Sequence, residues 1–194
     1  MDRYEVRLSG EGGQGLVLAG AVLAEAAGVY GGKFVAYTQS YGPESRGGGC
    51  RSDLVVSDQP IDYPICRQLD LLLCLTQKAC DQYWPMLKNG GVLIVDSRRV
   101  QQLHSGDFQA FSVPLLQTAK IKAGREGVAN MVCLGAIAKL SGLVTLEALL
   151  QAMRGRVPKG TTELNQRALE AGYGLEMEPA TARAHCVFAT EPGS

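Results

Sequence analysis

The stretch Arg7-Leu-Ser-Gly10-Glu-Gly12-Gly13-Gln14-Gly15-Leu-Val-Leu-Ala-Gly20 begins where a short apolar strand ends and continues into a helical pattern. Gly10, Gly12 and Gly15 stand at the spacing G-x-G-x-x-G. This spacing permits a tight turn from strand to helix and lets the backbone approach a bound group closely. The stretch therefore predicts a strand, a glycine turn and a helix, which form the first unit of an α/β fold.

Two interpretations of the glycine turn are open. Unpaired N–H groups and the positive end of a helix dipole favour an anion, usually a phosphate, held by Gly10, Gly12, Gly13, Gln14 and Gly15. Alternatively, the glycines only let the helix pack tightly on the strand. A lone motif of this kind is weak evidence for a ligand, so the spacing does not decide between the two.

Strand and helix patterns alternate over the first two thirds of the chain. This alternation indicates an α/β protein with an open, mainly parallel Rossmann-like sheet and helices on both faces. From residue 130 only helical patterns follow, so we expect a C-terminal helical segment that acts as a cap or an oligomer contact through self-association. The expected strands are 4–8, 33–38, 53–57, 70–75, 92–96 and 108–113, and the expected helices are 16–28, 65–69, 76–87, 115–124, 131–140, 146–153 and 164–171.

The length of 194 residues suits one compact domain. We expect a single α/β domain over residues 1–177, including C-terminal helices at about 128–174, and a flexible tail over 178–194. The 19 basic and 19 acidic residues give a formal net charge of zero, so nothing global suggests nucleic acid or a membrane as a partner. The chain shows neither a membrane-spanning run nor a signal peptide, and a cytoplasmic location is expected.

The cysteines and histidines do not form a recognisable metal or catalytic pattern. Six cysteines are present, but none forms C-x-x-C, so an iron–sulfur cluster or a structural zinc site lacks its usual spacing. His104 and His185 lie in unpatterned contexts without an established nucleophile nearby. We therefore expect reduced thiols and no metal site in this chain.

An acid expected in an NAD-binding unit is missing. Such a unit carries an aspartate or glutamate about 20 residues beyond the glycines, which holds the adenosine ribose. Here the region reads Tyr37-Thr-Gln-Ser40. This counts against a free-standing nucleotide-binding oxidoreductase, which stays as the alternative hypothesis. Asp96, at the end of the expected strand 92–96, suits either a ligand or a turn.

The second informative stretch is Thr38-Gln-Ser-Tyr-Gly-Pro-Glu-Ser-Arg46-Gly-Gly-Gly-Cys-Arg51-Ser52. It lacks a strand or helix period and is expected to be a loop. Guanidinium groups beside flexible glycine backbone suit a phosphate or a carboxylate, on a ligand or on a partner chain. We favour this binding role over a solvated loop, and we expect the loop and the glycine turn to form one anion-binding pocket because both follow adjacent strands of a parallel sheet.

Four motifs stand in order along the chain: Gly10-Glu-Gly-Gly-Gln-Gly15, Thr38-Gln-Ser-Tyr-Gly-Pro-Glu-Ser-Arg-Gly-Gly48, Ser52-Asp-Leu-Val-Val-Ser-Asp58 with Ile61-Asp-Tyr-Pro64, and Asn130-Met-Val-Cys-Leu-Gly135. With them the chain resembles the gamma subunits of 2-oxoacid:ferredoxin oxidoreductases, over nearly its whole length to about Gly174. The Thr-Gln-Ser-Tyr-Gly-Pro-Glu form is most similar to the 2-oxoglutarate type. The 2-oxoisovalerate and pyruvate types are the alternatives.

The resemblance implies a non-redox subunit of a multisubunit cytoplasmic enzyme, which converts 2-oxoglutarate to succinyl-CoA, CO₂ and reduced ferredoxin. Its implied partners are alpha and beta subunits, a delta or ferredoxin-like subunit, and ferredoxin through the complex. Thiamine diphosphate with Mg and the iron–sulfur clusters are expected in the partners, because this chain lacks a thiamine motif and ferredoxin cysteines. This chain alone is expected to be inactive, with neither a catalytic residue nor a cofactor of its own.

Coenzyme A is the ligand that the resemblance suggests for this chain. Its phosphates would rest on backbone N–H groups of the glycine turn and on guanidinium groups of the loop. The alternative is that the same surface only contacts a neighbouring subunit. The candidate binding residues are Gly10, Gly12, Gly13, Gln14, Gly15, Thr38, Gln39, Arg46 and Arg51.

Overall fold

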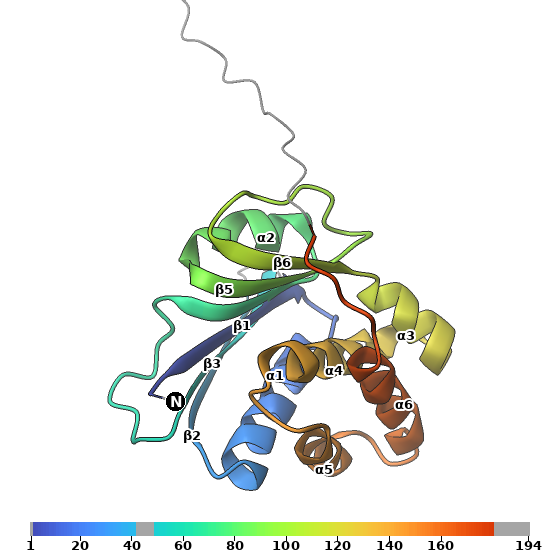
Figure 1. Ribbon diagram of the computed structural model, residues 1–194. Coiled ribbons are helices and arrows are strands. Elements are labelled where there is room, and N and C mark those ends of the chain that lie inside the picture. The colour runs from blue at the N-terminus through green and yellow to red at the C-terminus, as the bar shows by residue number, and fades with distance from the viewer. Residues whose placement is uncertain (1, 42–48, 181–194) are drawn as a thin grey trace, which may run out of the picture.

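The computed structural model describes residues 2–41 and 49–180. Its centre is a six-stranded sheet with the strand order β2-β3-β1-β4-β5-β6 (Figure 1). The strands are β1 (Tyr4–Glu11), β2 (Phe34–Tyr41), β3 (Gly49–Ser57), β4 (Leu69–Cys74), β5 (Leu87–Asp96) and β6 (Phe108–Val113).

Helices cover both faces of the sheet, which confirms the predicted α/β class (Figure 1). Helices α1, α3, α4, α5 and α6 lie on one face, called here the α1 face, and α2 lies on the other, called the α2 face. The helices are α1 (Leu16–Glu25), α2 (Gln77–Tyr83), α3 (Leu115–Ala123), α4 (Ala129–Ser141), α5 (Leu146–Arg156) and α6 (Thr162–Tyr173), with short turns η1 (Ala26–Tyr30), η2 (Trp84–Met86) and η3 (Glu126–Val128).

The sheet is mixed. Strands β1, β4, β5 and β6 pair in parallel, whereas β3 lies antiparallel between β1 and β2. The expectation that the glycine turn and the stretch 38–52 follow adjacent strands is therefore wrong, because β3 separates β1 from β2. The short connection explains this: residues 42–48 can join an antiparallel pair, but a parallel pair needs a crossover of about a dozen residues or more.

The described parts of the stretch 38–52, residues 38–41 and 49–52, are strand, which corrects the expectation of a loop there. Strand β2 continues to Tyr41 and β3 begins at Gly49, and the ladder pairs Thr38 with Asp53 and Tyr41 with Cys50. Side chains at this end of β2 are exposed, so the stretch carries no apolar alternation that would have revealed a strand. The remainder of the expected loop, with Arg46, lies outside the described residues.

Smaller departures concern turns and ends. Residues 65–69 do not form the expected helix, and β4 begins at Leu69. Asn89, Gly90 and Gly91 lie inside β5, where Gly90 has a φ of 76° and the pairing register shifts. Residues 181–194 of the expected tail lie outside the described residues, while Ala180 N–H donates to the Ala110 carbonyl of β6 at 2.6 Å.

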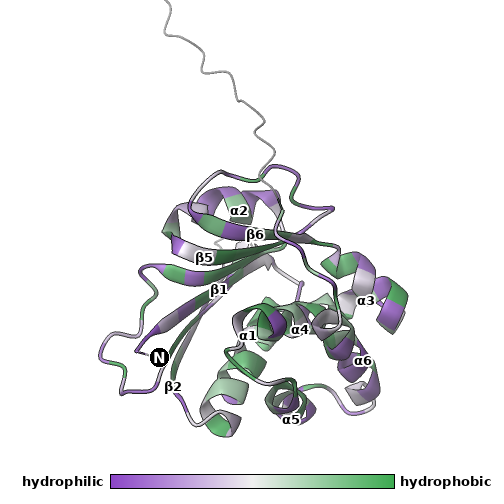
Figure 2. Ribbon diagram, in the orientation of Figure 1, coloured by the Kyte–Doolittle hydropathy of each residue, from purple (hydrophilic) through white to green (hydrophobic). Residues whose placement is uncertain are grey.

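The three C-terminal helices confirm the expected helical segment, but α4 belongs to the core rather than to a cap. All of its residues from Ala129 to Ala138 are buried. In Figure 2 apolar residues gather along the central strands, against which α1 and α4 pack. Among the described residues, no helix combines the length and the apolar composition that crossing a bilayer requires.

Helices α4 and α6 meet backbone to backbone at two glycines. A Cβ atom on Gly135 would lie 2.1 Å from the Leu169 carbonyl oxygen, and one on Gly172 would lie 2.0 Å from the Val132 carbonyl oxygen. Neither neighbour is a flexible side chain end that can move aside. Glycine at both positions therefore sets the distance between the two helices.

We predict that Gly135→Ala and Gly172→Ala each lower the free energy of unfolding by about 3 kcal/mol, because backbone must shift to admit the methyl group. Urea unfolding followed by circular dichroism measures this. Gly155→Ala is the control: its Cβ would meet only Glu25 Oε1 at 3.9 Å, at an exposed position of α5. It should raise stability by up to about 1 kcal/mol. Equal effects at all three glycines would contradict the close crossing.

Candidate functional site

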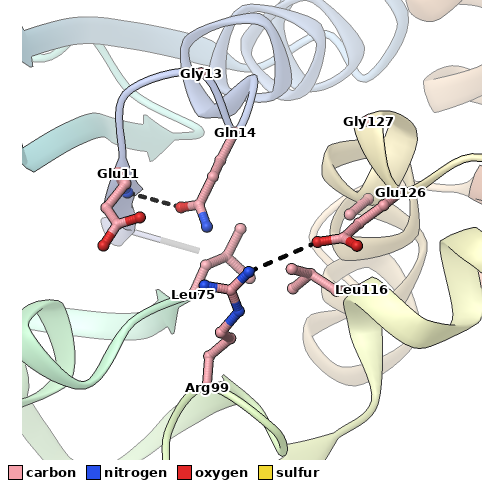
Figure 3. A pocket seen from close by; sticks show the side chains of 9 residues that line it. Glu11, Gly13, Gln14, Leu75, Arg99, Leu116, Glu126 and Gly127 are labelled. Atoms are coloured by element: carbon pink, nitrogen blue, oxygen red, sulfur yellow. Dashed lines mark hydrogen bonds and ion pairs between the residues drawn. The ribbon is translucent and has the colours of Figure 1, made fainter. Parts of the chain in front are cut away.

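A pocket of about 280 Å³ lies at the carboxyl ends of β1, β4 and β5 (Figure 3). The chain leaves β1 for a helix on the α1 face and leaves β4 for a helix on the α2 face, so the connections diverge here. In open α/β sheets, ligands bind at such a switch point. The lining residues are Glu11, Gly13, Gln14, Leu75, Arg99, Leu116, Glu126, Gly127 and Ala129.

The glycines of the turn have different tasks. Gly10 and Gly15 are packing residues: a Cβ on Gly10 would lie 2.2 Å from Gln14 Oε1, and one on Gly15 would lie 2.7 Å from Asn130 Nδ2. Gly13 has a φ of 92° and lines the pocket, and a Cβ there would meet nothing within 4 Å. Gly10 and Gly15 thus lie close against side chains, as the packing interpretation expects, whereas Gly13 faces open space.

Arg99 supplies the guanidinium group of the pocket, and sequence reasoning missed it. Asp96 fixes the backbone from which this side chain extends: its Oδ1 accepts hydrogen bonds from the backbone N–H groups of Arg98 and Arg99 at 3.0 and 3.1 Å. Oδ2 accepts one from Leu116 N–H at 2.9 Å, in the first turn of α3. Asp96 is therefore fully used as a turn and helix cap. The sequence did hold a signal for Arg99: an arginine that closely follows an aspartate at the end of a predicted strand.

The pocket combines one cation with two carboxylates and an apolar wall. Arg99 Nη2 lies 3.8 Å from Glu126 Oε1, and the two side chains are 51% and 52% exposed, so their attraction is weak. Gln14 Oε1 accepts the Glu11 N–H at 2.7 Å (Figure 3). Helix α1 begins beside the pocket without a side-chain cap, which leaves N–H groups and a positive dipole end. An anion at this place would have to displace Glu126 from Arg99, because the pocket's one guanidinium stands against two carboxylates.

The structure brings together only part of the predicted site. Gly13 and Gln14 line the pocket, and Gly12 lies in the exposed turn beside them. Thr38 and Gln39 lie on β2, two strands away from β1, and Gln39 Oε1 accepts a hydrogen bond from Tyr37 Oη at 3.2 Å. Arg51 does not line the pocket; it lies on the α2 face.

On the α2 face, Arg7 and Asp53 form a buried ion pair between β1 and β3. Arg7 Nε and Nη2 donate to the two carboxylate oxygens of Asp53 at 2.6 and 2.7 Å, and both residues are buried. Burial lowers the pKa of Arg7, but the hydrogen bonds and charge of Asp53 raise it, and the balance lies above the ordinary value. Arg7 also lies over the Tyr83 ring, 4.6 Å from its centroid.

The described thiols do not suit a cluster. All five are buried, and burial is the largest cause that raises the pKa of Cys50, Cys74 and Cys133, and of Cys66 to about 12. The described residues hold no group of three or more histidine, cysteine or acidic side chains that could bind a metal ion. An iron–sulfur cluster does not fit this part of the chain.

The strand order also argues against an NAD-binding site. In the usual dinucleotide-binding unit the second strand lies beside the first, so its terminal acid reaches the ribose. Here β3 occupies that place, and β2 ends one strand further away without an acid. His104, the described histidine, pairs with Asp81 at 2.7 Å and stacks on Trp84. Neither feature supports a nicotinamide site.

Residues 5–175 match the pyruvate ferredoxin/flavodoxin oxidoreductase family. The chain belongs to this family. It is 43% identical over 178 residues to the 2-oxoglutarate synthase subunit KorC of Methanocaldococcus jannaschii, which covers 91% of this chain and 95% of that protein. The gamma subunit of a keto/oxoacid ferredoxin oxidoreductase from Geobacter sulfurreducens is 49% identical, with a TM-score of 0.82 over 89% of this chain and 95% of the other.

A more distant relative shares the fold alone. The 2-oxoglutarate:ferredoxin oxidoreductase from Magnetococcus marinus is 22% identical, with a TM-score of 0.78 over 89% of this chain and 31% of that chain. The two nearer relatives confirm the resemblance that the sequence motifs carry. Within the family, this chain is a gamma-type subunit of a 2-oxoacid:ferredoxin oxidoreductase, most similar to the 2-oxoglutarate type.

We predict that Gly15→Ala lowers the free energy of unfolding by more in the wild-type background than in an Asn130→Ala background, with a difference of about 1 kcal/mol. The left-handed backbone strain is the same in both, whereas the contact with Asn130 exists only in the first. Urea unfolding of the four proteins gives the coupling. Gly13→Ala, which has the backbone strain and no contact, should show no coupling to Asn130. Equal costs of Gly15→Ala in both backgrounds would rule out the contact.

Proposed function

We propose that this chain is the gamma subunit of a 2-oxoglutarate:ferredoxin oxidoreductase, in which it supports assembly and binds part of coenzyme A. The observation that carries the assignment is the likeness to gamma-type chains along nearly the whole length of both proteins. The 2-oxoglutarate preference rests on the similarity to the KorC chain. Rates of the assembled enzyme with 2-oxoglutarate, pyruvate and 2-oxoisovalerate test it, and a higher rate with either other acid would contradict it.

The glycine-turn pocket suits one part of coenzyme A. Backbone N–H groups near Gly13 and the Arg99 guanidinium fit a phosphate, and the apolar wall of Leu75, Leu116 and Ala129 fits a flat ring. Its volume of about 280 Å³ is small for a whole coenzyme, so the arm that carries the thiol would extend toward a neighbouring subunit. The Magnetococcus marinus relative was solved with coenzyme A and succinyl-CoA bound.

This chain's residues would bind and orient the coenzyme while the partners carry the redox chemistry. The buried, dispersed thiols of the described residues do not fit an iron–sulfur cluster, and thiamine diphosphate is expected in a partner subunit. The proposed contribution is positional: a fixed phosphate limits where the thiol end can reach.

We predict that Arg99→Ala raises the apparent KM for coenzyme A by roughly 10- to 100-fold in the assembled enzyme, because a charge-assisted hydrogen bond is lost. The KM for the 2-oxoacid and the yield of complex should stay unchanged. Arg98→Ala is the matched control, since Arg98 is the exposed neighbour and does not line the pocket. An unchanged KM for coenzyme A with impaired assembly would leave only an interface role for this surface.

We predict that the purified chain alone oxidises no 2-oxoacid, because the thiamine and cluster sites are expected in its partners. Reduction of ferredoxin or of methyl viologen, with coenzyme A and each 2-oxoacid present, measures this. Adding the other subunits should restore the rate. Turnover by the single chain would overturn the assignment, and tight binding of NAD or FAD in isothermal titration would favour a free-standing oxidoreductase instead.

A further inference from the structure

Two arginines on the α2 face share one carboxylate. Arg7 takes both oxygens of Asp53 in a buried pair. Arg51, two residues before Asp53 on the same strand, lies with Nε 3.8 Å from Asp53 Oδ2, which is beyond hydrogen-bond distance. Because Asp53 is already fully paired, the cluster carries one surplus positive charge, and it resides on Arg51.

The Arg51 side chain contacts a ring and a carboxylate but donates no hydrogen bond to the described residues. Its guanidinium lies 5.9 Å from the centroid of the Tyr83 ring, and its side chain is 39% exposed. Within residues 2–41 and 49–180 the guanidinium donates no hydrogen bond, and the side chain stays partly exposed. A guanidinium that is oriented by a ring and a distant carboxylate loses less freedom on binding than a fully mobile one.

The neighbours of Arg51 add donors and an apolar contact. Ser40 lies opposite Arg51 in the β2–β3 ladder, and Thr38 lies opposite Asp53. Residues two apart along a strand share a face, so Phe34, Thr38 and Ser40 lie on the α2 face of β2 with Arg51 beside them. Phe34 is 49% exposed, and Thr38 and Ser40 are exposed. We call Phe34, Thr38, Ser40, Arg51 and Tyr83 the Arg51 face.

This part of the sheet lacks the cover that the other parts have. Helix α2 packs on β1 and β4, and the ring of its last residue, Tyr83, contacts the guanidinium groups of Arg7 and Arg51. The exposure of Phe34, Thr38 and Ser40 shows that the described residues leave β2 open on this face. Sheets of α/β proteins are normally covered on both faces. The open area is therefore a candidate contact for another chain.

We propose that the Arg51 face is the docking surface for a neighbouring subunit of the oxidoreductase, which presents an aspartate or glutamate side chain to Arg51. This rests on the proposed function, since it requires a multisubunit complex. The surplus charge selects a carboxylate, the Ser40 and Thr38 hydroxyls offer it further donors, and Phe34 gives apolar contact area. A protein carboxylate fits better than a small anion, because Arg51 does not line the pocket at the strand ends and a solvated anion gains little on an exposed face.

The test compares variants in the fully co-expressed complex. Arg51→Gln should weaken the affinity of this chain for the remaining subunits by roughly 30-fold or more and reduce its dependence on salt, because a paired charge is lost at the interface. Arg51→Glu should abolish copurification with a tagged partner, and Arg51→Lys should restore part of the affinity. Arg154→Glu, an exposed reversal on α5, is the matched control and should assemble normally. Thermal unfolding of each free chain verifies that the variants fold.

The outcomes separate this proposal from the proposed function. If the wild-type chain brings down no partner subunit, the proposed function fails. If the wild type assembles and Arg51→Gln and Arg51→Glu assemble with the same affinity and salt dependence, only the docking surface is overturned. A raised KM for coenzyme A in Arg51→Gln with unchanged assembly would overturn it as well, since Arg51 would then bind the ligand.

Discussion

The buried pair between Arg7 and Asp53 determines how the two halves of the sheet join. It links β1 to β3, the antiparallel strand, at positions that face each other directly in the ladder. Truncating one partner of such a pair leaves a buried charge and costs about 3–5 kcal/mol. A slip of β3 by one residue would move Asp53 to the α1 face, so the pair permits a single register. The positions of β2 and of Arg51 follow from that register.

Most of the fold could be predicted because the buried positions of helices and strands recur at regular intervals, so apolar residues recur in the sequence at the same intervals. The strand 108–113 coincides with β6, and the helices after residue 129 were found from their apolar spacing. The strand 53–57 was predicted as well, but its antiparallel pairing and its start at Gly49 were missed for a physical reason. Strands β2 and β3 meet in a hairpin whose outer end is exposed, so Thr38 to Tyr41 carry polar residues and look like a loop. These residues are a strand because their backbone pairs with β3, and the sequence of a single strand does not reveal such pairing.

The site was only partly predictable because local motifs do not reveal which face of a sheet a side chain takes. Gly13 and Gln14 line the pocket as their place after β1 suggested. Arg51 was grouped with them on chemistry, yet strand parity puts it on the α2 face. Arg99 follows the carboxyl end of β5 and lies near the glycine turn because parallel strands end at the same edge of the sheet. Contacts between residues that follow different strands depend on the strand order, and no single sequence motif predicts that order.

Asp96 gives the pocket a dynamic property. One carboxylate caps the first turn of α3 at Leu116 and fixes the backbone of Arg99, so the helix and the pocket share one hydrogen-bonded joint. Fraying of α3 from its first turn would release both at once. Amide hydrogen exchange at Leu116 then reports the opening of the helix end and of the pocket together. The pocket persists only as long as this helix end stays closed.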